Sequence, residues 1–372
     1  MKKKLIRLFA ALLCMLLLFT ACSGTGDPTE TSGSAGSDGD GSTEASGTTG
    51  GEGDKEFTWD DSLPIQANST SFPMTVRDFI GNETVLTEKP QRVAILSGAP
   101  LNIWYDLGGK SVCTSTISSN LKVVTEYADE IKALPSIGKV TSVNLEAIVE
   151  YEPDLIIAQE NSQSETIDLL QQWGYKVITT YLRDYDDVVA TYRAFGAILG
   201  NTELAETKVK ALESRYGELL AKKPAEGKRV VILYLTSKKL QVKLDGSIAG
   251  IVAKDLGLVN IASGISPVEE GSENATLDIE YLVEQQPDMI LVTSMISSNE
   301  QAISTMQEHL TTNDAWKGVT AAQNGNIVYL PQEYFLYNAG PYFDEALRYM
   351  ACSVYPEIYG ELDAWYQPQS AD

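Results

Sequence analysis

Short apolar runs recur along the chain from about residue 68, and stretches with amphipathic spacing separate them. Six of these runs are rich in β-branched residues and predict buried strands at 92–96, 155–158, 176–179, 230–235, 289–292 and 327–330. Strands that alternate with helices form parallel sheets covered by those helices. The pattern therefore predicts an α/β fold.

Two segments of the chain, 144–157 and 278–291, repeat each other. Each begins with a candidate N-cap, Asn144 or Asp278, and continues with a short helical pattern, a Pro-Asp turn and a buried strand. Glu146 and Glu280 occupy equivalent positions, seven residues before the proline. A match of this length indicates two related lobes.

Between the two copies, residues 185–222 have apolar side chains at three- and four-residue spacings, which is typical of an amphipathic helix. The pair Gly200-Asn201 is a point of interruption within this pattern. About 35 helical residues span roughly 50 Å, the scale of two domains. We therefore expect two Rossmann-like lobes with mainly parallel sheets, 68–184 and 228–367, joined by one long rigid helix over 185–222.

The N-terminus has the pattern of an export signal. A basic start precedes an apolar run over 8–19, which is too short to span a bilayer of about 30 Å. Ala21-Cys22 resembles the lipobox of bacterial lipoproteins, although Phe19 stands where leucine is usual. We expect a signal peptide over 1–21, lipid on Cys22, and a disordered acidic Gly/Ser/Thr linker over 22–57. The alternative is an ordinary signal peptide with an incidental cysteine.

Charge and composition exclude several classes of function. The 28 basic and 51 acidic residues give a net charge of −23, which disfavours a nucleic-acid partner. The single histidine, His309, makes histidine-rich metal sites and Ser-His-Asp triads improbable. Gly108 to Ser111 resemble the end of a phosphate-binding loop, but position 104 is tryptophan rather than glycine. We therefore expect no enzyme activity, no cofactor and no metal held by the protein itself.

Cys113 and Cys352 are the cysteines that remain after the signal peptide and the lipidation site. Two distant cysteines do not make a disulfide framework, although an exported protein can form a bond. We expect both to be buried, unpaired side chains.

Several blocks, in order, resemble the extracytoplasmic solute-binding proteins of ABC importers. The resemblance is to the helix-linked subclass that takes up iron siderophores, haem and cobalamin, and it covers nearly all of 74–358. It depends on residues 75–85 and 89–96, on Ile137-Gly138 followed by 144–157, on 315–331, and on 346–356. It implies a monomer at the outer face of the cell membrane, held there by its lipid, that delivers a small molecule to a permease and its ATPase.

The resemblance also gives the repeated glutamates a role. In this family, one acidic residue on each lobe docks on basic residues of the permease, and Glu146 and Glu280 match those positions. One exposed carboxylate on each lobe can engage a two-fold transporter and steer the encounter. The alternative is that both side chains only favour the helix dipole from the first helical turn.

The ligand should lie between the lobes, at the carboxyl ends of the parallel strands. The loops there contain sixteen candidate ligand-binding residues, with packing under loops as the alternative for Trp104 and Tyr337: Ser97, Gly98, Trp104, Gln159, Glu160, Asn161, Tyr181, Arg183, Thr236, Ser237, Lys238, Thr293, Ser294, Met295, Tyr334 and Tyr337.

The family resemblance implies a bulky metal chelate, with a ferric siderophore first and cobalamin or haem as the alternatives. Arg183, Lys238, Lys239 and Lys243 supply positive charge for an anionic ferric catecholate. Frequent Tyr, Ser, Asn and Gln residues also suit a neutral hydroxamate complex or a corrinoid. His309 lies outside the predicted cleft, which disfavours ligation of haem by histidine but leaves tyrosine or methionine open. A surface lipoprotein enzyme or a sensor on the same scaffold is the rival function.

Overall fold

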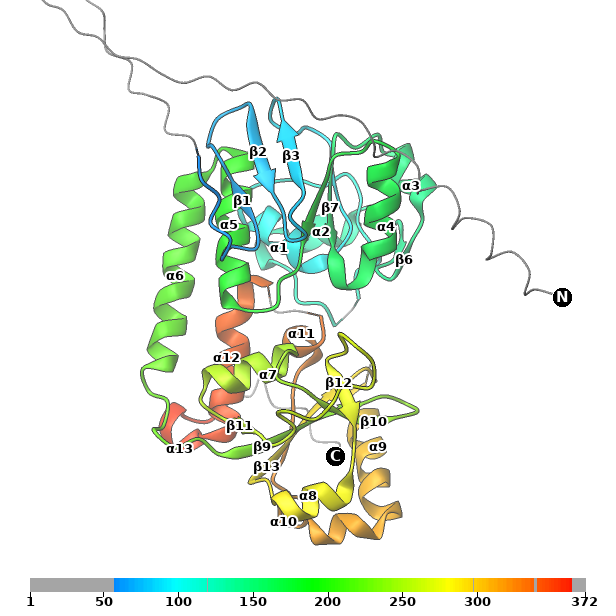
Figure 1. Cartoon of the computed structure of the whole chain (residues 1–372), viewed down its shortest axis with the longest axis vertical. Coiled ribbons are helices and arrows are strands. Elements are labelled where there is room, and N and C mark those ends of the chain that lie inside the picture. The colour runs from blue at the N-terminus through cyan, green and yellow to red at the C-terminus, as the bar shows by residue number, and fades with distance from the viewer. Residues whose placement is uncertain (1–56, 119, 297, 338–339, 363–372) are drawn as a thin grey trace, which may run out of the picture. The chain divides into compact units, whose positions relative to one another are not determined.

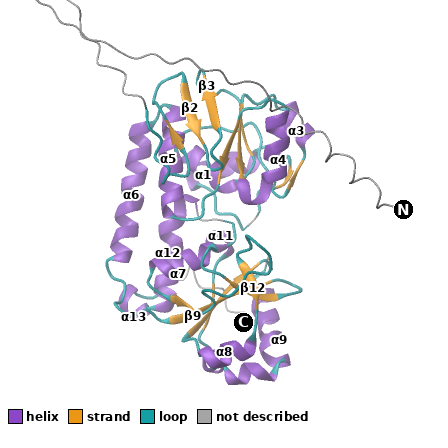
Figure 2. Ribbon diagram, viewed as in Figure 1, coloured by secondary structure: helices purple, strands orange, loops and turns teal. Residues whose placement is uncertain are grey.

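All six predicted strands are present, in two separate sheets with helices around them (Figures 1 and 2). The computed structural model describes residues 57–362, apart from 119, 297 and 338–339. The predicted signal peptide, Cys22 and nearly all of the predicted linker lie outside these residues, as does the end of the predicted second lobe. Within the described residues, no helix combines the length and the apolar character needed to cross a membrane.

The first lobe is built on a parallel sheet in the order β4-β7-β8, formed by β4 (Val93–Ile95), β7 (Leu155–Gln159) and β8 (Val177–Thr180). Every residue of these three strands is buried, which explains why their sequences do not alternate between apolar and polar. The remaining strands of this lobe are β1 (Gln66–Ala67), β2 (Met74–Arg77) and β3 (Glu83–Leu86) in an antiparallel sheet, and the hairpin of β5 (Gly138–Lys139) and β6 (Ser142–Val143).

The second lobe contains a mixed sheet. Parallel strands form its centre: β9 (Arg229–Leu235), β11 (Val259–Asn260), β13 (Met289–Ser294) and β14 (Ile327–Tyr329). Two further strands lie beyond β9, each antiparallel to its neighbour: β10 (Leu240–Lys243) and, at the edge, β12 (Asn274–Thr276). The sheets confirm the predicted α/β class, and β10 and β12 add an antiparallel edge to the second one.

The helices follow the strands in the expected alternation. In the first lobe they are α1 (Gly98–Asp106), η1 (Thr125–Tyr127), α2 (Ala128–Ala133), α3 (Leu145–Glu150), α4 (Glu160–Gln172) and α5 (Tyr185–Leu199). After the connecting helix α6 (Thr202–Leu220) come α7 (Ile248–Asp255), α8 (Ile279–Gln285), α9 (Asn299–Thr312), η2 (Asp314–Gly318), α10 (Thr320–Gln323), α11 (Gln332–Phe335), η3 (Gly340–Tyr342), α12 (Phe343–Val354) and α13 (Pro356–Tyr359).

The prediction of one long helix over 185–222 is wrong. The chain forms two helices, α5 and α6, which pack side by side (Figure 1). Gly200 ends α5 in the left-handed conformation, with φ of 71°, and this turns the chain back on itself. A Cβ at Gly196 would lie 2.5 Å from the Cβ of Ala205, so the close approach of the helices depends on that glycine. Only α6 therefore leads from the first lobe to the second.

One hydrophobic cluster includes side chains from both lobes. It takes Val93 and Ile95 from β4, Val230 and Ile232 from β9, and the buried faces of α1, α5, α6, α7 and α12. Alternate residues of the same strands belong to two other clusters, one in each lobe. The helices α6 and α12 pack against each other within the shared cluster, so the lobes are joined through buried apolar contacts.

We expect Gly200→Ala to lower the free energy of unfolding by about 1 kcal/mol, because alanine is strained at positive φ. The matched control is Gly217→Ala, in the exposed interior of α6, where a Cβ meets no other atom. That change should stabilise the protein by about 0.5–1 kcal/mol, because alanine favours the helix. Denaturant unfolding of both variants gives the comparison, and stabilisation by Gly200→Ala would contradict the assigned turn.

Candidate functional site

The strand ends of the first lobe form a buried hydrogen-bonded layer. The Ser97 hydroxyl donates to Oε1 of Gln159 at 2.5 Å, and the Gln159 N–H donates to Oε1 of Gln163 at 2.9 Å. Nε2 of Gln163 in turn donates to the Leu96 carbonyl at 2.8 Å. Ser97 and Gln159 are each only 6% exposed, so this layer lies beneath the surface. Glu160 is half-buried and Asn161 is exposed, so these two side chains reach the surface at the strand ends. Gln163, at a kink in α4, was not predicted.

Gly98 lies under the loop that contains Leu121, and neighbouring side chains of this loop contact the second lobe. A Cβ on Gly98 would lie 2.3 Å from Cδ2 of Leu121, so the loop packs directly on the start of α1. Side chains of this loop, including Asn120 and Lys122, reach the other lobe. Gly98 therefore permits the loop to approach α1.

Trp104 does not belong to the site. Its side chain is 1% exposed, its ring meets Phe195 edge to face at 5.2 Å, and its Nε1 donates to the Lys110 carbonyl. Trp104 lies within α1, and its side chain faces the hydrophobic core rather than the strand ends. This burial agrees with the alternative of packing under a loop rather than with contact to a ligand.

Tyr181 and Arg183 follow β8 and are half-buried. Nε of Arg183 donates to Oδ2 of the buried Asp187 at 2.8 Å, and the guanidinium stands 4.9 Å from the centre of the Phe79 ring. The same ring meets Tyr181 edge to face at 5.4 Å. Arg183 is thus held in place by an ion pair and an aromatic face, beside Tyr181.

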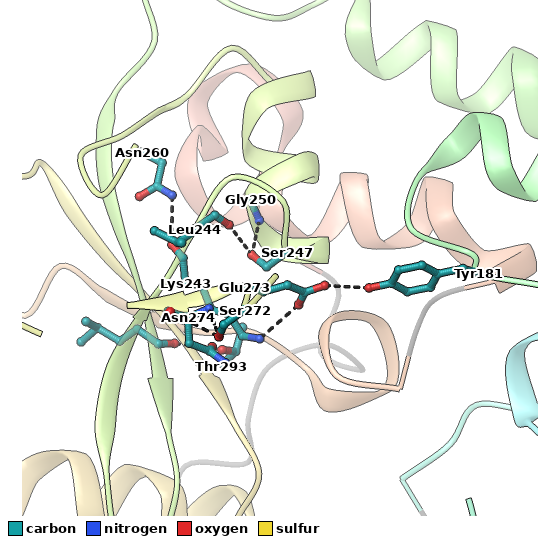
Figure 3. Close-up of polar contacts among 11 residues, drawn as sticks. Tyr181, Lys243, Leu244, Ser247, Gly250, Asn260, Ser272, Glu273, Asn274 and Thr293 are labelled. Atoms are coloured by element: carbon teal, nitrogen blue, oxygen red, sulfur yellow. Dashed lines mark hydrogen bonds and ion pairs between the residues drawn. The ribbon is translucent and has the colours of Figure 1, made fainter. Parts of the chain in front are cut away.

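Tyr181 crosses to the second lobe (Figure 3). Its hydroxyl donates to Oε1 of Glu273 at 2.9 Å, while Oε2 of Glu273 lies 3.4 Å from Nζ of Lys243. Nζ of Lys243 also stands 4.6 Å from the centre of the Tyr234 ring. One carboxylate therefore joins a phenol of the first lobe to an ammonium group of the second.

Burial changes the protonation chemistry of this contact. Loss of solvent lowers the pKa of Lys243, and the Glu273 carboxylate acts in the opposite direction. Loss of solvent raises the pKa of Tyr181, and there the same carboxylate adds to the effect. Glu273 therefore stabilises the ammonium form of Lys243 and the neutral phenol of Tyr181.

The backbone around Lys243 is fixed on both sides (Figure 3). The Lys243 carbonyl accepts from Nδ2 of Asn260 at 3.1 Å, and the Leu244 N–H donates to the Glu273 carbonyl at 2.8 Å. The Ser247 hydroxyl, which caps α7, donates to the Leu244 carbonyl at 2.7 Å. These contacts hold Lys243, the last residue of β10, beside Glu273, which directly precedes β12.

Hydroxyl groups at the strand ends of the second lobe bond to nearby backbone groups. The Thr236 hydroxyl accepts from the N–H groups of Lys238 and Lys239, and the Thr293 hydroxyl donates to the Leu233 carbonyl. Thr293 and Ser294 are buried. By contrast, three predicted residues present exposed side chains: Ser237, Lys238 and Met295.

A second polar contact between the lobes involves α11. Nδ2 of Asn120 donates to Oε1 of Gln332 at 3.1 Å. Lys122 donates to the Tyr334 hydroxyl at 3.1 Å and pairs with Glu345. Tyr334 is fully buried and packs at this junction, while Tyr337 is half-buried.

Two cavities lie beside helices that link the lobes. One, of about 630 Å³, lies between α6 and α12 and is lined by ion pairs that include Lys208–Asp106 and Arg215–Asp344. The other, of about 580 Å³, is lined by Tyr185, Tyr216 and acidic side chains. Neither lining includes a predicted ligand residue.

Glu146 and Glu280 are both exposed, each in the first turn of a short helix. The Asn144 side chain accepts from the Ala147 N–H at 3.1 Å at the start of α3. The Asp278 side chain accepts from the Glu280 N–H at 2.9 Å at the start of α8. The predicted caps are confirmed, and Glu146 and Glu280 lie at equivalent exposed positions of the two helices.

Cys113 and Cys352 are both buried, as predicted, and burial raises the pKa of the Cys113 thiol to about 11. No group of three or more His, Cys, Asp or Glu side chains in this part of the chain is arranged to hold a metal ion.

Comparison with known proteins places this geometry in a family. The sequence profile of the family described as periplasmic binding protein matches residues 93–334. The uncharacterized ABC transporter substrate-binding lipoprotein YvrC of Bacillus subtilis is 22% identical, over 78% of this chain and 88% of that protein. The cobalamin-binding protein of Halobacterium salinarum is 23% identical, over 69% and 68%. The Fe(3+)-citrate-binding protein YfmC of B. subtilis is 23% identical, over 66% and 74%.

Solved structures share the fold. An ABC transporter substrate-binding protein from Listeria monocytogenes EGD-e matches with a TM-score of 0.61 and 21% identity, over 72% of this chain and 99% of that one. S. aureus IsdE, solved in complex with heme, matches with a TM-score of 0.60 and 20% identity, over 71% and 98%.

We expect Glu273→Gln to lower the pKa of both Lys243 and Tyr181, because the carboxylate raises each of them. Titration of labelled lysine side chains by NMR follows the first group, and tyrosinate absorbance follows the second. Glu270→Gln, at a nearby exposed position, is the matched control and should change neither. An unchanged pKa of Lys243 in Glu273→Gln would contradict the contact in Figure 3.

Proposed function

Because the chain belongs to the periplasmic binding protein family, we propose that it captures a ferric siderophore between its lobes and delivers it to the permease and ATPase of an ABC importer. Membership confirms the family resemblance drawn from the sequence. The relatives named above are described as binding proteins rather than enzymes, which supports a role in binding without catalysis.

The observation that supports delivery is the matched pair Glu146 and Glu280. Each lobe presents an exposed glutamate in the first turn of a short helix, and an Asn or Asp side chain caps the start of that helix. A transporter with two related halves can bind both at once, and the separation of two weak contacts on one rigid unit gives avidity as well as orientation. If Glu146 and Glu280 only favoured the helix dipole, their carboxylates would not need to be exposed.

The surface that supports ligand capture consists of polar and aromatic side chains. Asn161, Tyr181, Arg183, Lys238 and Tyr337 are exposed or half-buried, and they come from both lobes. These groups donate hydrogen bonds and match the oxygen-rich outer surface of a ferric chelate. The amide-rich edge of cobalamin offers similar acceptors, and one relative is named a cobalamin-binding protein, so cobalamin is the second candidate.

The proposed location is the outer face of the cell membrane. Three relatives of this chain carry the word lipoprotein in their names, and Cys22 completes a sequence that resembles a lipobox. A linker of about 34 residues has an average reach of roughly 30–35 Å. We propose that lipid on Cys22 holds the binding lobes within this distance of the permease.

We expect the double variant Glu146→Ala/Glu280→Ala to reduce uptake of the ferric siderophore by about tenfold or more, because two charged contacts across the interface are lost. The affinity for the siderophore should stay unchanged, since neither residue is among the predicted ligand-binding residues. Cellular uptake of radiolabelled iron and calorimetry with purified protein measure the two effects.

The matched control is Glu150→Ala/Glu284→Ala. These glutamates lie one turn further along the same helices, at equivalent positions of the repeat, and are also exposed. The control removes the same charge from the same elements and should leave uptake close to wild type. Equal uptake by wild type and Glu146→Ala/Glu280→Ala would overturn the docking role.

A further inference from the structure

The turn after each of these helices contains the same pair of contacts between an aspartate and the backbone of an arginine. The Asp154 carboxylate accepts from the Arg92 N–H at 3.0 Å, and the Asp154 N–H donates to the Arg92 carbonyl at 3.0 Å. In the second lobe, the Asp288 carboxylate accepts from the Arg229 N–H at 2.7 Å, and the Asp288 N–H donates to the Arg229 carbonyl at 2.8 Å. Each arginine directly precedes, or begins, the first strand of its lobe's parallel sheet.

The arginine side chains repeat as well. Nε of Arg92 donates to the carbonyl of Tyr151 at 3.0 Å, at the end of α3. Nη2 of Arg229 donates to the carbonyl of Gln285 at 3.1 Å, at the end of α8. Tyr151 and Gln285 are equivalent in the repeat. Carbonyls at a helix C-terminus lack partners within the helix, and a cation there also favours the helix dipole.

Both turns contain the same unusual backbone conformation. Glu152 and Gln286 have φ of 44° and 45°, and in the part of the chain that the structure describes they are the only residues besides glycine with positive φ. They occupy equivalent positions, one residue before the proline. Such conformations are strained and persist where the surrounding contacts hold them. Because both lobes keep the same strained conformation, we infer that the contacts around each turn hold its backbone in this conformation.

We propose that Arg92 and Arg229 are positioning residues for permease docking, an inference that rests on the proposed function. Helices of six and seven residues have too few internal hydrogen bonds to be rigid alone. Asn144 and Asp278 fix the beginnings of these helices, and the two arginines tie their ends to the sheet. Glu146 and Glu280 are therefore presented in matching orientations, and less ordering is required when the partner binds.

A purely structural role would give a different pattern of effects. If the arginines only stabilised the lobes, their removal would affect docking whether or not the glutamates were present. If each acts through the glutamate on its own helix, its removal should matter only while that glutamate is there. The two pairs also allow a crossed comparison, since Arg92 should be independent of Glu280.

A double-mutant cycle tests the proposal with the cognate permease–ATPase in proteoliposomes and the full lipidated chain. The measured quantity is the concentration of binding protein that gives half-maximal stimulation of ATP hydrolysis. Arg92→Ala should raise it about threefold to fivefold, with the maximal rate and the siderophore affinity unchanged. In the Glu146→Ala background the same change should have an effect of less than about 1.5-fold, whereas in the Glu280→Ala background it should keep its full effect.

A conservative variant and a measurement on the free protein keep the test valid. Arg92→Lys retains a donor and a charge and should restore most of the wild-type value. Hydrogen exchange of the α3 amides should be faster in Arg92→Ala, while exchange in α8 stays as in wild type. If Arg92→Ala folds poorly, Arg92→Gln and the corresponding Arg229 variants provide the same cycle.

The outcomes separate the two proposals. If Glu146→Ala and Glu280→Ala leave the half-maximal concentration unchanged, the docking role and this inference both fail. If the glutamates matter but Arg92→Ala has no effect, or an equal effect with and without Glu146, only the inference fails. A loss confined to backgrounds that retain Glu146 supports it.

Discussion

The buried contact between α6 and α12 is the constraint on which the two-lobed arrangement depends. Both helices belong to a hydrophobic cluster that includes β4 in one lobe and β9 in the other. Ion pairs flank it, with Arg215 on α6 bound to the buried Asp344 on α12. Opening this contact would expose apolar surface at a cost of about 25 cal/mol per Å², so wide separation of the lobes is unfavourable. Ligand entry must use smaller movements.

The contacts on the polar surfaces between the lobes are of a different kind. Tyr181 and Glu273 meet through one hydrogen bond, and Asn120 and Gln332 through another. Bonds of this type contribute only about 1 kcal/mol each when water can replace them. They can therefore break and form as a ligand enters, while the α6–α12 contact stays closed. The packed helices α6 and α12 limit how far the lobes can separate, while the polar contacts between the lobes can exchange. This combination favours a binding protein whose lobes close by a small movement.

The sequence was sufficient to predict the strands and the repeat, because buried parallel strands are nearly continuous apolar runs and a cap followed by a Pro-Asp turn is a specific signal. It marked Gly200-Asn201 as an interruption but did not predict that the chain reverses there, since both helices have the same amphipathic spacing and only the left-handed Gly200 turns the chain back. Trp104 shows that sequence position near a strand end does not decide whether a side chain faces the core. Glu273 was missed because it precedes β12, an antiparallel edge strand to which the rule for parallel strand ends does not apply. Lys243 was predicted only as a source of positive charge.

The central claim is that this chain binds a ferric siderophore, and calorimetric titration of the purified full chain tests it most directly. The panel consists of a ferric hydroxamate, a ferric catecholate, haem, cobalamin and an iron salt alone. The account predicts saturable binding of one ferric siderophore class with a Kd of about 1 μM or below, equivalent to roughly −8 kcal/mol, and none of the iron salt. Saturable binding of cobalamin or haem, with no binding of either ferric siderophore, would contradict it.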